Sequence, residues 1–195
     1  MSHHIYHTEA IVLNTKPVGE AGKFVYVLTQ ELGLISAKAQ GVRLINSKLR
    51  YSLQDFSHVE VSLVRGKEIW RLTGAKLIKE NNLHKKNSEN FLILYRLSKL
   101  LLRLLHGEEK NIKLFELITN TLTFLEEHFT AEELKTLEII AVLRILRSLG
   151  YFGQEKSLEA FAKDNDWHKE LLVTFRPEQA KALILINNAL KETQL

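Results

Sequence analysis

The chain has 195 residues, of which 45% are hydrophobic and 26% charged, so it is long enough for one sizeable core or two small ones. It contains no cysteine, which excludes disulfide bonds, thiolate catalysis and cysteine-ligated zinc. Its net charge of +4 lies in residues 1–80, with 11 Lys and Arg against 7 Asp and Glu, whereas residues 81–195 hold 16 of each. A basic module followed by a neutral one suggests that the first faces a polyanion.

The amino terminus, MSHHIYHTEA, has no apolar core and no small-residue cleavage site. We therefore expect no secretory signal and a protein that stays in the cytoplasm. The three histidines in this segment, His3, His4 and His7, have no carboxylate partners beside them, so we expect no metal there.

Five short stretches rich in β-branched and aromatic residues predict strands in the first 80 residues. They are Thr8–Thr15, Lys23–Thr29, Leu34–Ala39, Val59–Val64 and Ile69–Thr73. Gly33 supplies the positive φ that a tight hairpin needs. In the second strand, Phe24 and Tyr26 alternate with Val25 and Val27, so both faces are expected to be covered, as in a small barrel.

The longest connection falls between the third and fourth strands, and the segment Val42–Leu53 in it has room for one or two helical turns. Five strands with this spacing match the oligonucleotide/oligosaccharide-binding (OB) fold, a five-stranded Greek-key barrel. We predict this barrel for residues 1–80.

The stretch Ser36–Phe56, which includes this connection, carries four cations between Glu31 and Asp55 with no acidic residue to cancel them: Lys38, Arg43, Lys48 and Arg50. Several fixed positive charges with few bulky apolar groups are what a contact to backbone phosphates needs. The turn between the fourth and fifth strands adds Arg65 and Lys67, and Arg71 follows. The alternative interpretation is a solvated surface without a ligand.

Three aromatic residues near these cations can stack on unpaired bases if they are exposed. Core packing is the favoured interpretation for Phe56 and Trp70, while both interpretations stay open for Tyr51.

From residue 81 the apolar period becomes helical. The predicted helices are 91–105, 112–129, 131–149, 156–163 and 177–190. Thr130-Ala131-Glu132-Glu133 has the spacing of a capping box, and Gly150 ends the third helix. Residues 81–195 are therefore predicted to be an all-helical domain, and the whole chain a two-domain α+β protein.

The helix at 91–105 carries three charges on one stripe. With these charges in about 15 residues, it is too short and too charged to span a bilayer. On the third helix, Lys135, Arg144 and Arg147 are expected near the surface. A leucine-lined groove with cations at its rim suits an acidic, apolar peptide tail, and plain solvation of the helices is the alternative. The candidate rim residues are Lys99, Arg103, Arg144 and Arg147.

Catalytic patterns are missing from the sequence. No HExxH motif or nucleophile elbow occurs, and Phe24 stands where a phosphate loop needs a magnesium-binding hydroxyl. Paired carboxylates such as Glu132 and Glu133 are consecutive and diverge on a helix. We therefore predict a protein that is not an enzyme and uses no cofactor or metal.

Residues 5–80 resemble the N-terminal domain of the bacterial recombination-mediator family RecO. Within residues 85–155, the helices that end in LRILRSLGYFG resemble the family's long helix. The matching points are the turn at Glu20, Thr29 with Glu31 and Gly33, the segments Ala39–Gly41 and Ser47–Arg50, and Leu53-Gln54-Asp55-Phe56. Two features depart from the family pattern. Gln40 stands where many members have lysine, and no cysteine follows Gly150-Tyr151, so the family's zinc knuckle is expected to be absent.

The resemblance implies an OB barrel followed by a shortened helical domain. It implies a DNA-binding mediator of DNA repair and recombination in the DNA-damage (SOS) response, which binds single- and double-stranded DNA and anneals complementary strands. Its implied partners are RecR, the acidic tail of single-stranded-DNA-binding protein (SSB) and, indirectly, RecA, at the nucleoid in the cytoplasm. A protein-interaction scaffold and an RNA-binding OB protein remain the alternatives.

Overall fold

The computed structural model describes residues 4–80, 88–151 and 155–192. Contacts divide the chain into two compact units. The barrel unit consists of Met1–Asn81 with Leu105–Phe115, and the helical unit of Asn82–Leu104 with Glu116–Leu195. The predicted domain boundary after Glu80 adjoins residues 81–87, which lie outside the described ranges.

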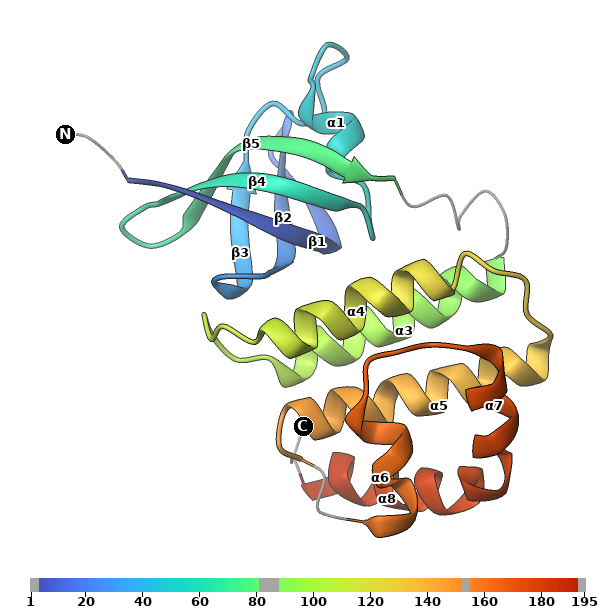
Figure 1. The fold of residues 1–195 in the computed structure, drawn as a ribbon. Coiled ribbons are helices and arrows are strands. Elements are labelled where there is room, and N and C mark those ends of the chain that lie inside the picture. The colour runs from blue at the N-terminus through green and yellow to red at the C-terminus, as the bar shows by residue number, and fades with distance from the viewer. Residues whose placement is uncertain (1–3, 81–87, 152–154, 193–195) are drawn as a thin grey trace. The chain divides into compact units, whose positions relative to one another are not determined.

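Five strands close into a barrel in the order β1-β2-β3-β5-β4, with β4 also pairing with β1 (Figure 1). The strands are β1 (Ile5–Val18), β2 (Gly22–Thr29), β3 (Gly33–Ala39), β4 (His58–Arg65) and β5 (Trp70–Lys79). All neighbours are antiparallel except β3 and β5, which run parallel. The predicted OB fold is confirmed. Strand β5 is longer than predicted because its mostly exposed second half still pairs with β4, up to Lys79 opposite His58.

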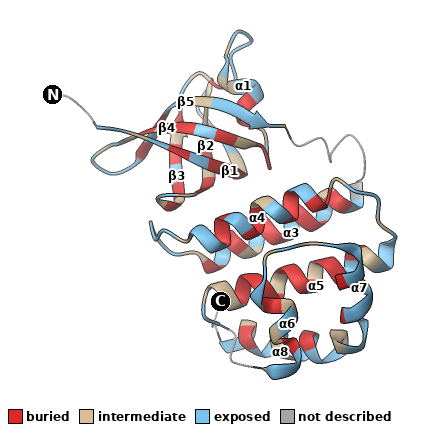
Figure 2. Ribbon diagram, in the orientation of Figure 1, coloured by how far each residue is buried: buried red, intermediate tan, exposed pale blue. Residues whose placement is uncertain are grey.

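The barrel interior is filled by alternate residues of each strand, shown in red in Figure 2. They include Val25, Val27, Ile35, Val61 and Leu63, all at most 1% exposed. On the outer side of β2, Phe24 and Tyr26 are half-buried rather than fully covered.

The β2–β3 hairpin turns at Gly33, whose φ of 72° confirms the predicted positive value. The Thr29 hydroxyl donates a hydrogen bond to the Gly33 carbonyl at 2.8 Å. A Cβ on Gly33 would lie 2.2 Å from the Glu109 carbonyl oxygen, so a side chain would displace the 105–115 segment from the barrel unit.

The predicted helix-rich second part of the chain is confirmed, although the bounds differ. The elements are α3 (Ser88–Leu104), α4 (Ile112–Phe124), α5 (Ala131–Ser148), α6 (Lys156–Lys163), α7 (Lys169–Phe175), the 3₁₀ turn η1 (Arg176–Glu178) and α8 (Gln179–Glu192). Helix α4 ends five residues earlier than predicted, because the amides of Glu126 and Glu127 bond three residues back in tight turns. The short α7 was not predicted, and Pro177 lies in η1. No helix in the described parts of the chain is long and apolar enough to cross a membrane.

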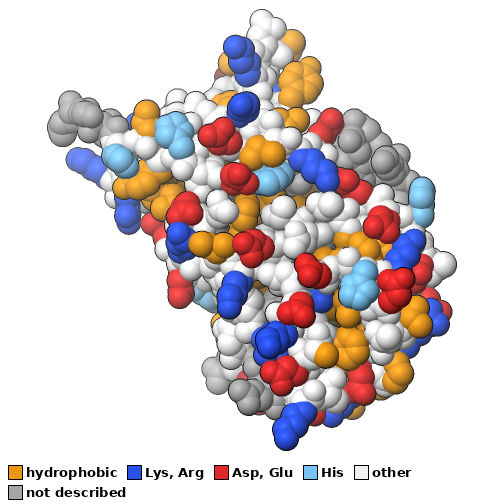
Figure 3. Space-filling view, viewed as in Figure 1, with side chains coloured by type: hydrophobic (Ala, Val, Ile, Leu, Met, Phe, Trp, Pro, Cys, Tyr) orange, Lys and Arg blue, Asp and Glu red, His pale blue; other side chains and the backbone are white. Residues whose placement is uncertain are grey.

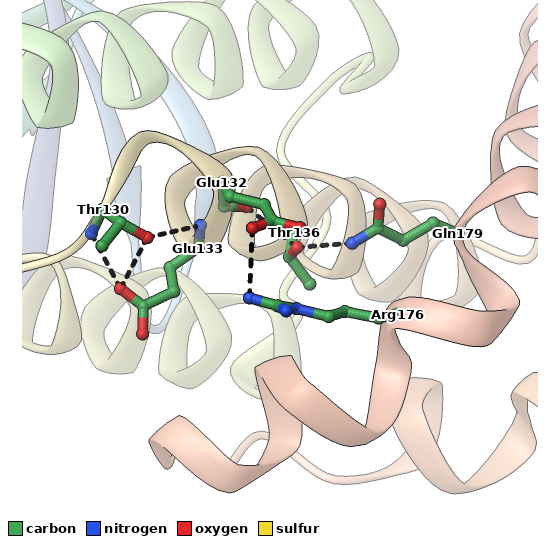
Figure 4. A network of polar contacts seen from close by, with 6 residues as sticks. All are labelled: Thr130, Glu132, Glu133, Thr136, Arg176 and Gln179. Carbon is green, nitrogen blue, oxygen red and sulfur yellow. Dashed lines mark hydrogen bonds and ion pairs between the residues drawn. The ribbon is translucent and has the colours of Figure 1, made fainter.

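Thr130 caps α5 as the sequence predicts (Figure 4). Its hydroxyl accepts from the Glu133 amide at 3.3 Å, and the Glu133 carboxylate accepts from the Thr130 amide at 2.7 Å. The Thr130 amide and hydroxyl both donate hydrogen bonds to the Glu133 carboxylate, at 2.7 and 3.0 Å, and these two bonds lower the pKa of Glu133 below its ordinary value. The first turns of α5 also hold the η1–α8 segment, through an ion pair from Arg176 to Glu132 at 3.3 Å and a hydrogen bond from Gln179 to Thr136.

Arg144 corrects an expectation, because its side chain is buried rather than near the surface, with 2% exposed. Its Nε donates to the Phe161 carbonyl at 2.8 Å, and its guanidinium lies 4.4 Å from the centre of the Trp167 ring. Burial lowers the pKa of Arg144 to about 10, so the group stays charged at neutral pH. The prediction was wrong because α6 and the segment that follows it cover this side of α5, which the helical period alone does not reveal.

Candidate nucleic-acid interface

A groove of about 690 Å³ lies on the outer surface of the barrel, between β3, the start of β5 and the β4–β5 turn. Four of the eight predicted DNA-binding residues line it: Lys38, Arg65, Lys67 and Arg71. Gln40, which replaces a lysine of the family pattern, lines it too, and Glu68 is its one carboxylate among the described lining residues. An adjoining hollow of about 370 Å³ shares Lys38, Gln40 and Arg71 and reaches Leu49 of α1 (Leu49–Ser52). Cations from three strands and a turn thus meet in one open site.

The centre of the groove is formed by Lys38 and Arg71, which are direct register partners on the parallel strands β3 and β5. Like charges at neighbouring strand positions repel one another, and a bridging anion would relieve that repulsion. Within residues 4–80, 88–151 and 155–192, neither side chain makes an ion pair, and the same holds for Lys67. Their charge is therefore available to a ligand.

Arg65 is held at the edge of the groove by other groups. Its guanidinium lies 5.6 Å from the centre of the Trp70 ring and 3.7 Å from a Glu108 carboxylate oxygen. The same carboxylate accepts a hydrogen bond from the Trp70 indole at 2.7 Å. The contact from Glu108 positions Arg65 and partly neutralises it, so Arg65 is less available than Lys38 or Arg71.

The remaining predicted residues, Arg43, Lys48, Arg50 and Tyr51, are all exposed on the long β3–β4 connection. Arg43 ties this connection to the β1–β2 turn: its amide donates to the Ala21 carbonyl at 3.0 Å and its guanidinium to the Gly19 carbonyl at 3.2 Å. Leu49 of α1 reaches the hollow beside the groove, and it is flanked by the N-cap residue Lys48 and by Arg50.

The three aromatic candidates separate clearly. Phe56 is 4% and Trp70 6% exposed, which confirms core packing for both. Phe56 has a φ of 67°, unusual for an aromatic residue, at the turn that leads back into β4. Tyr51 is 67% exposed, which leaves its ring open to a stacking partner.

Three residues on the outer face of β1 and β2 were not among the predicted DNA-binding residues: Lys16, Phe24 and Tyr26. Lys16 pairs in register with Phe24, which pairs with Lys38, so one cross-strand row continues from the groove to β1. Lys16 lies 5.5 Å from the centre of the neighbouring Tyr26 ring. The alternation of Phe24 and Tyr26 against two valines was visible in the sequence. Only the register shows that these rings adjoin the cations.

In the helical unit, the four candidate rim cations are in different environments. Lys99 and Arg103 are exposed on α3, with Lys99 lying 5.2 Å from the Tyr95 ring centre. Arg147 is half-buried and forms an ion pair with Glu159 at 3.6 Å. Arg144 is buried and cannot line an accessible rim.

The described ranges contain no group of three His, Asp or Glu side chains that could hold a metal ion. His7 hydrogen-bonds to Ser62 at 3.1 Å, and the His4 ring packs edge-on against Tyr6. His3 lies outside the described residues.

The geometry defines a class: an OB-fold protein with an open cationic groove, linked to a helical unit. Two family models match the chain, "Recombination protein O N terminal" over residues 1–81 and "Recombination protein O C terminal" over residues 86–154. The chain belongs to the RecO family of DNA repair proteins.

Curated relatives agree with the family models. The chain is 30% identical over 164 residues to the DNA repair protein RecO of Thermodesulfovibrio yellowstonii, covering 80% of this chain and 65% of that protein. It is 35% identical over 150 residues to the protein of the same name from Dehalococcoides mccartyi strain BAV1, covering 76% and 57%. The match to the Chlorobium limicola protein is 29% identical over 149 residues, covering 75% and 56%. The chain therefore spans between half and two thirds of the length of these relatives.

Proposed function

We propose that this chain is a noncatalytic recombination mediator that binds single- and double-stranded DNA through the barrel groove and anneals complementary strands. The observation that carries the proposal is the gathering of Lys38, Lys67 and Arg71 in one groove without ion pairs among the described residues. Such an arrangement leaves a positive potential that a polyphosphate backbone complements.

The proposed mechanism needs no bond-making chemistry. Phosphates of a strand lie along Lys38 and Arg71, and the cations of the β3–β4 connection extend this path. Phosphate contacts are independent of sequence, and they reduce the repulsion between two strands. The exposed Tyr51 ring can stack on an unpaired base, a contact worth about 1 to 3 kcal/mol. Annealing follows because the base edges that are not covered remain free to pair.

The proposed partners follow from the family. We propose that the chain acts on SSB-coated DNA at the nucleoid, in the cytoplasm, and helps to load RecA together with RecR. The acidic, apolar SSB tail would bind exposed side chains of α3, which include Leu92, Tyr95, Lys99 and Arg103; of these, Lys99 lies against the Tyr95 ring. A titration with the isolated tail peptide tests this site: Lys99→Ala with Arg103→Ala should weaken binding, whereas Arg147→Ala should not.

The salt dependence of DNA binding tests the groove. Lys38→Ala with Arg71→Ala should make the slope of log K against log salt shallower by about two for duplex DNA, because two phosphate contacts are lost. The matched control is Lys156→Ala with Lys163→Ala, two exposed cations of α6 in the helical unit. An unchanged slope for the groove variant, or an equal change for the control, would contradict the proposed site.

The β3–β4 connection has its own test. Lys48→Ala with Arg50→Ala should weaken DNA binding and reduce the salt slope in the same way. If the slope stays at the wild-type value, this connection does not contact phosphates, and the groove alone carries binding.

Competition among single-stranded DNA, duplex DNA and RNA at two salt concentrations separates the rival functions. A DNA mediator should prefer DNA and lose affinity as salt rises. Stronger binding to RNA would support an RNA-binding OB protein, and the absence of nucleic-acid binding would support a protein scaffold.

A further inference from the structure

The β3–β4 connection exposes an unusual amount of apolar surface at its tip. Leu44 is 58% and Ile45 82% exposed, and both lie between the cations Arg43 and Lys48 in the sequence. Tyr51 on α1, which follows, is 67% exposed. In Figure 3 the projecting end of the barrel unit, at the top of the view, carries hydrophobic and Lys or Arg side chains. Neighbouring exposed apolar residues of this size indicate a contact surface.

The tip is held in place from both sides. Val42 and Leu53, which flank it, are completely buried in the barrel core. Between them, successive turns bond Leu44 to Gly41, Ser47 to Leu44 and Arg50 to Ser47 at 3.1 to 3.2 Å. Arg43 adds the two hydrogen bonds to the β1–β2 turn. Because these anchors use the flanking residues, Leu44 and Ile45 point away from the core in a preformed turn.

The charges around the tip indicate its partner. From Leu32 to Gln54 the sequence has no acidic residue, and Arg43, Lys48 and Arg50 make no ion pair within the described part of the chain. A purely apolar protein surface would not complement these cations, whereas DNA offers phosphates on the outside and apolar base faces between them. The combination matches proteins that insert an apolar side chain between base steps while cations hold the backbone.

We propose that this tip is a DNA wedge. Leu44 and Ile45 enter between neighbouring bases at a duplex end or fork, while Arg43, Lys48 and Arg50 hold the phosphates beside it. The inference rests on the proposed DNA-binding function and goes beyond it, because it assigns the tip an unstacking activity that phosphate contacts do not supply. Opening of the terminal base steps would expose base edges where two strands exchange or begin to pair.

The test uses the full chain and a forked DNA duplex with the fluorescent base 2-aminopurine at the junction, where unstacking raises its emission. Binding is followed in parallel by fluorescence anisotropy of the same DNA labelled at a distant end. Three proteins are compared: the wild type, Leu44→Ser with Ile45→Ser, and the control Val173→Ser with Ile184→Ser. The control removes two exposed apolar side chains, 58% and 62% exposed, from the helical unit. Thermal unfolding confirms that each variant is folded.

The wild type and the control should raise the 2-aminopurine emission on binding, and the tip variant should lose more than half of that rise. Its affinity by anisotropy should stay within about threefold of the wild type, because phosphate contacts dominate affinity. A full rise in emission with the tip variant would overturn the wedge while leaving DNA binding intact. Absence of an anisotropy change with the wild type would instead overturn the proposed function itself.

Discussion

Five basic residues of the helical unit and the two at the centre of the barrel groove differ in whether a carboxylate pairs with them. In the helical unit, five cations each form an ion pair with a glutamate: Arg96, Arg147, Lys169, Arg176 and Lys181. In the barrel unit, the central groove cations Lys38 and Arg71 make no ion pair within the described ranges. The comparison teaches that the net charge of a segment matters less than whether its charges are already satisfied.

The difference has an energetic meaning. An exposed ion pair contributes about 0 to 1 kcal/mol to stability, and each paired charge loses most of its long-range field. Unpaired neighbours such as Lys38 and Arg71 contribute nothing favourable to folding, yet they keep a field that can attract a polyanion. The five paired cations of the helical unit thus help to hold its segments together, whereas the two central groove cations remain available for binding.

The largest effect is expected when the charge of the groove is reversed, which tests whether its unpaired cations bind DNA. Lys38→Glu with Arg71→Glu should lower the affinity for single-stranded DNA by about a hundredfold or more at low salt, because attraction becomes repulsion. Reversal of Lys156 and Lys163 in α6 is the matched control, and fluorescence anisotropy measures both. An equal loss in both variants would mean that only net charge matters and that the groove is not a site.

Removal of the buried charge in the helical unit should affect stability and not binding. Arg144→Ala leaves the Phe161 carbonyl without its donor and opens a cavity beside Trp167. The free energy of unfolding in urea should fall by about 2 to 4 kcal/mol. Arg147→Ala, which loses one partly exposed ion pair, should cost less than about 1 kcal/mol. Equal costs would show that Arg144 is not a packing residue.

Removal of the α5 cap should have a smaller effect on the free energy of unfolding, and this effect should depend on pH. Thr130→Ala should destabilise the protein by about 1 kcal/mol at neutral pH, because the Glu133 amide loses its acceptor. The pKa of Glu133 is lowered in the folded state, so its contribution is complete above the ordinary glutamate pKa and is lost as the pH falls through the lower folded value. Urea unfolding at pH 7 and at pH 3 to 4 should therefore show a smaller deficit for the variant in acid. A deficit that is independent of pH would argue against the reciprocal cap.

The smallest effect is expected at the Arg96–Glu138 ion pair, the counterpart in the helical unit of the unpaired groove cations. Arg96 binds the carboxylate through two nitrogens, yet the arginine side chain is 53% exposed. Arg96→Ala should change the unfolding free energy by about 0.5 kcal/mol. Repetition in high salt should reduce even this difference, and a loss several times larger would show that the pair is structural.

Much of the barrel could be predicted because its signals are local. The five strands appear as β-branched and aromatic runs, Gly33 marks the hairpin, and Thr130 with Glu133 marks the start of a helix. The helix bounds were less accurate, because the end of α4 depends on the turns that follow it. The burial of Arg144 could not be predicted from the sequence. The helical period places Arg144 on one side of α5, but it does not show which segment packs against that side.

The sequence by itself determined the two-part organisation, the position of the strands and the excess of cations in the first 80 residues, since composition and periodicity are properties of neighbouring residues. Only the tertiary structure decided that Lys38 and Arg71 become neighbours, because the parallel pairing of β3 with β5 joins residues far apart in the chain. It also decided that Tyr51 and Ile45 face solvent. Long-range pairing sets which charges meet and which side chains remain exposed, and no local pattern specifies it.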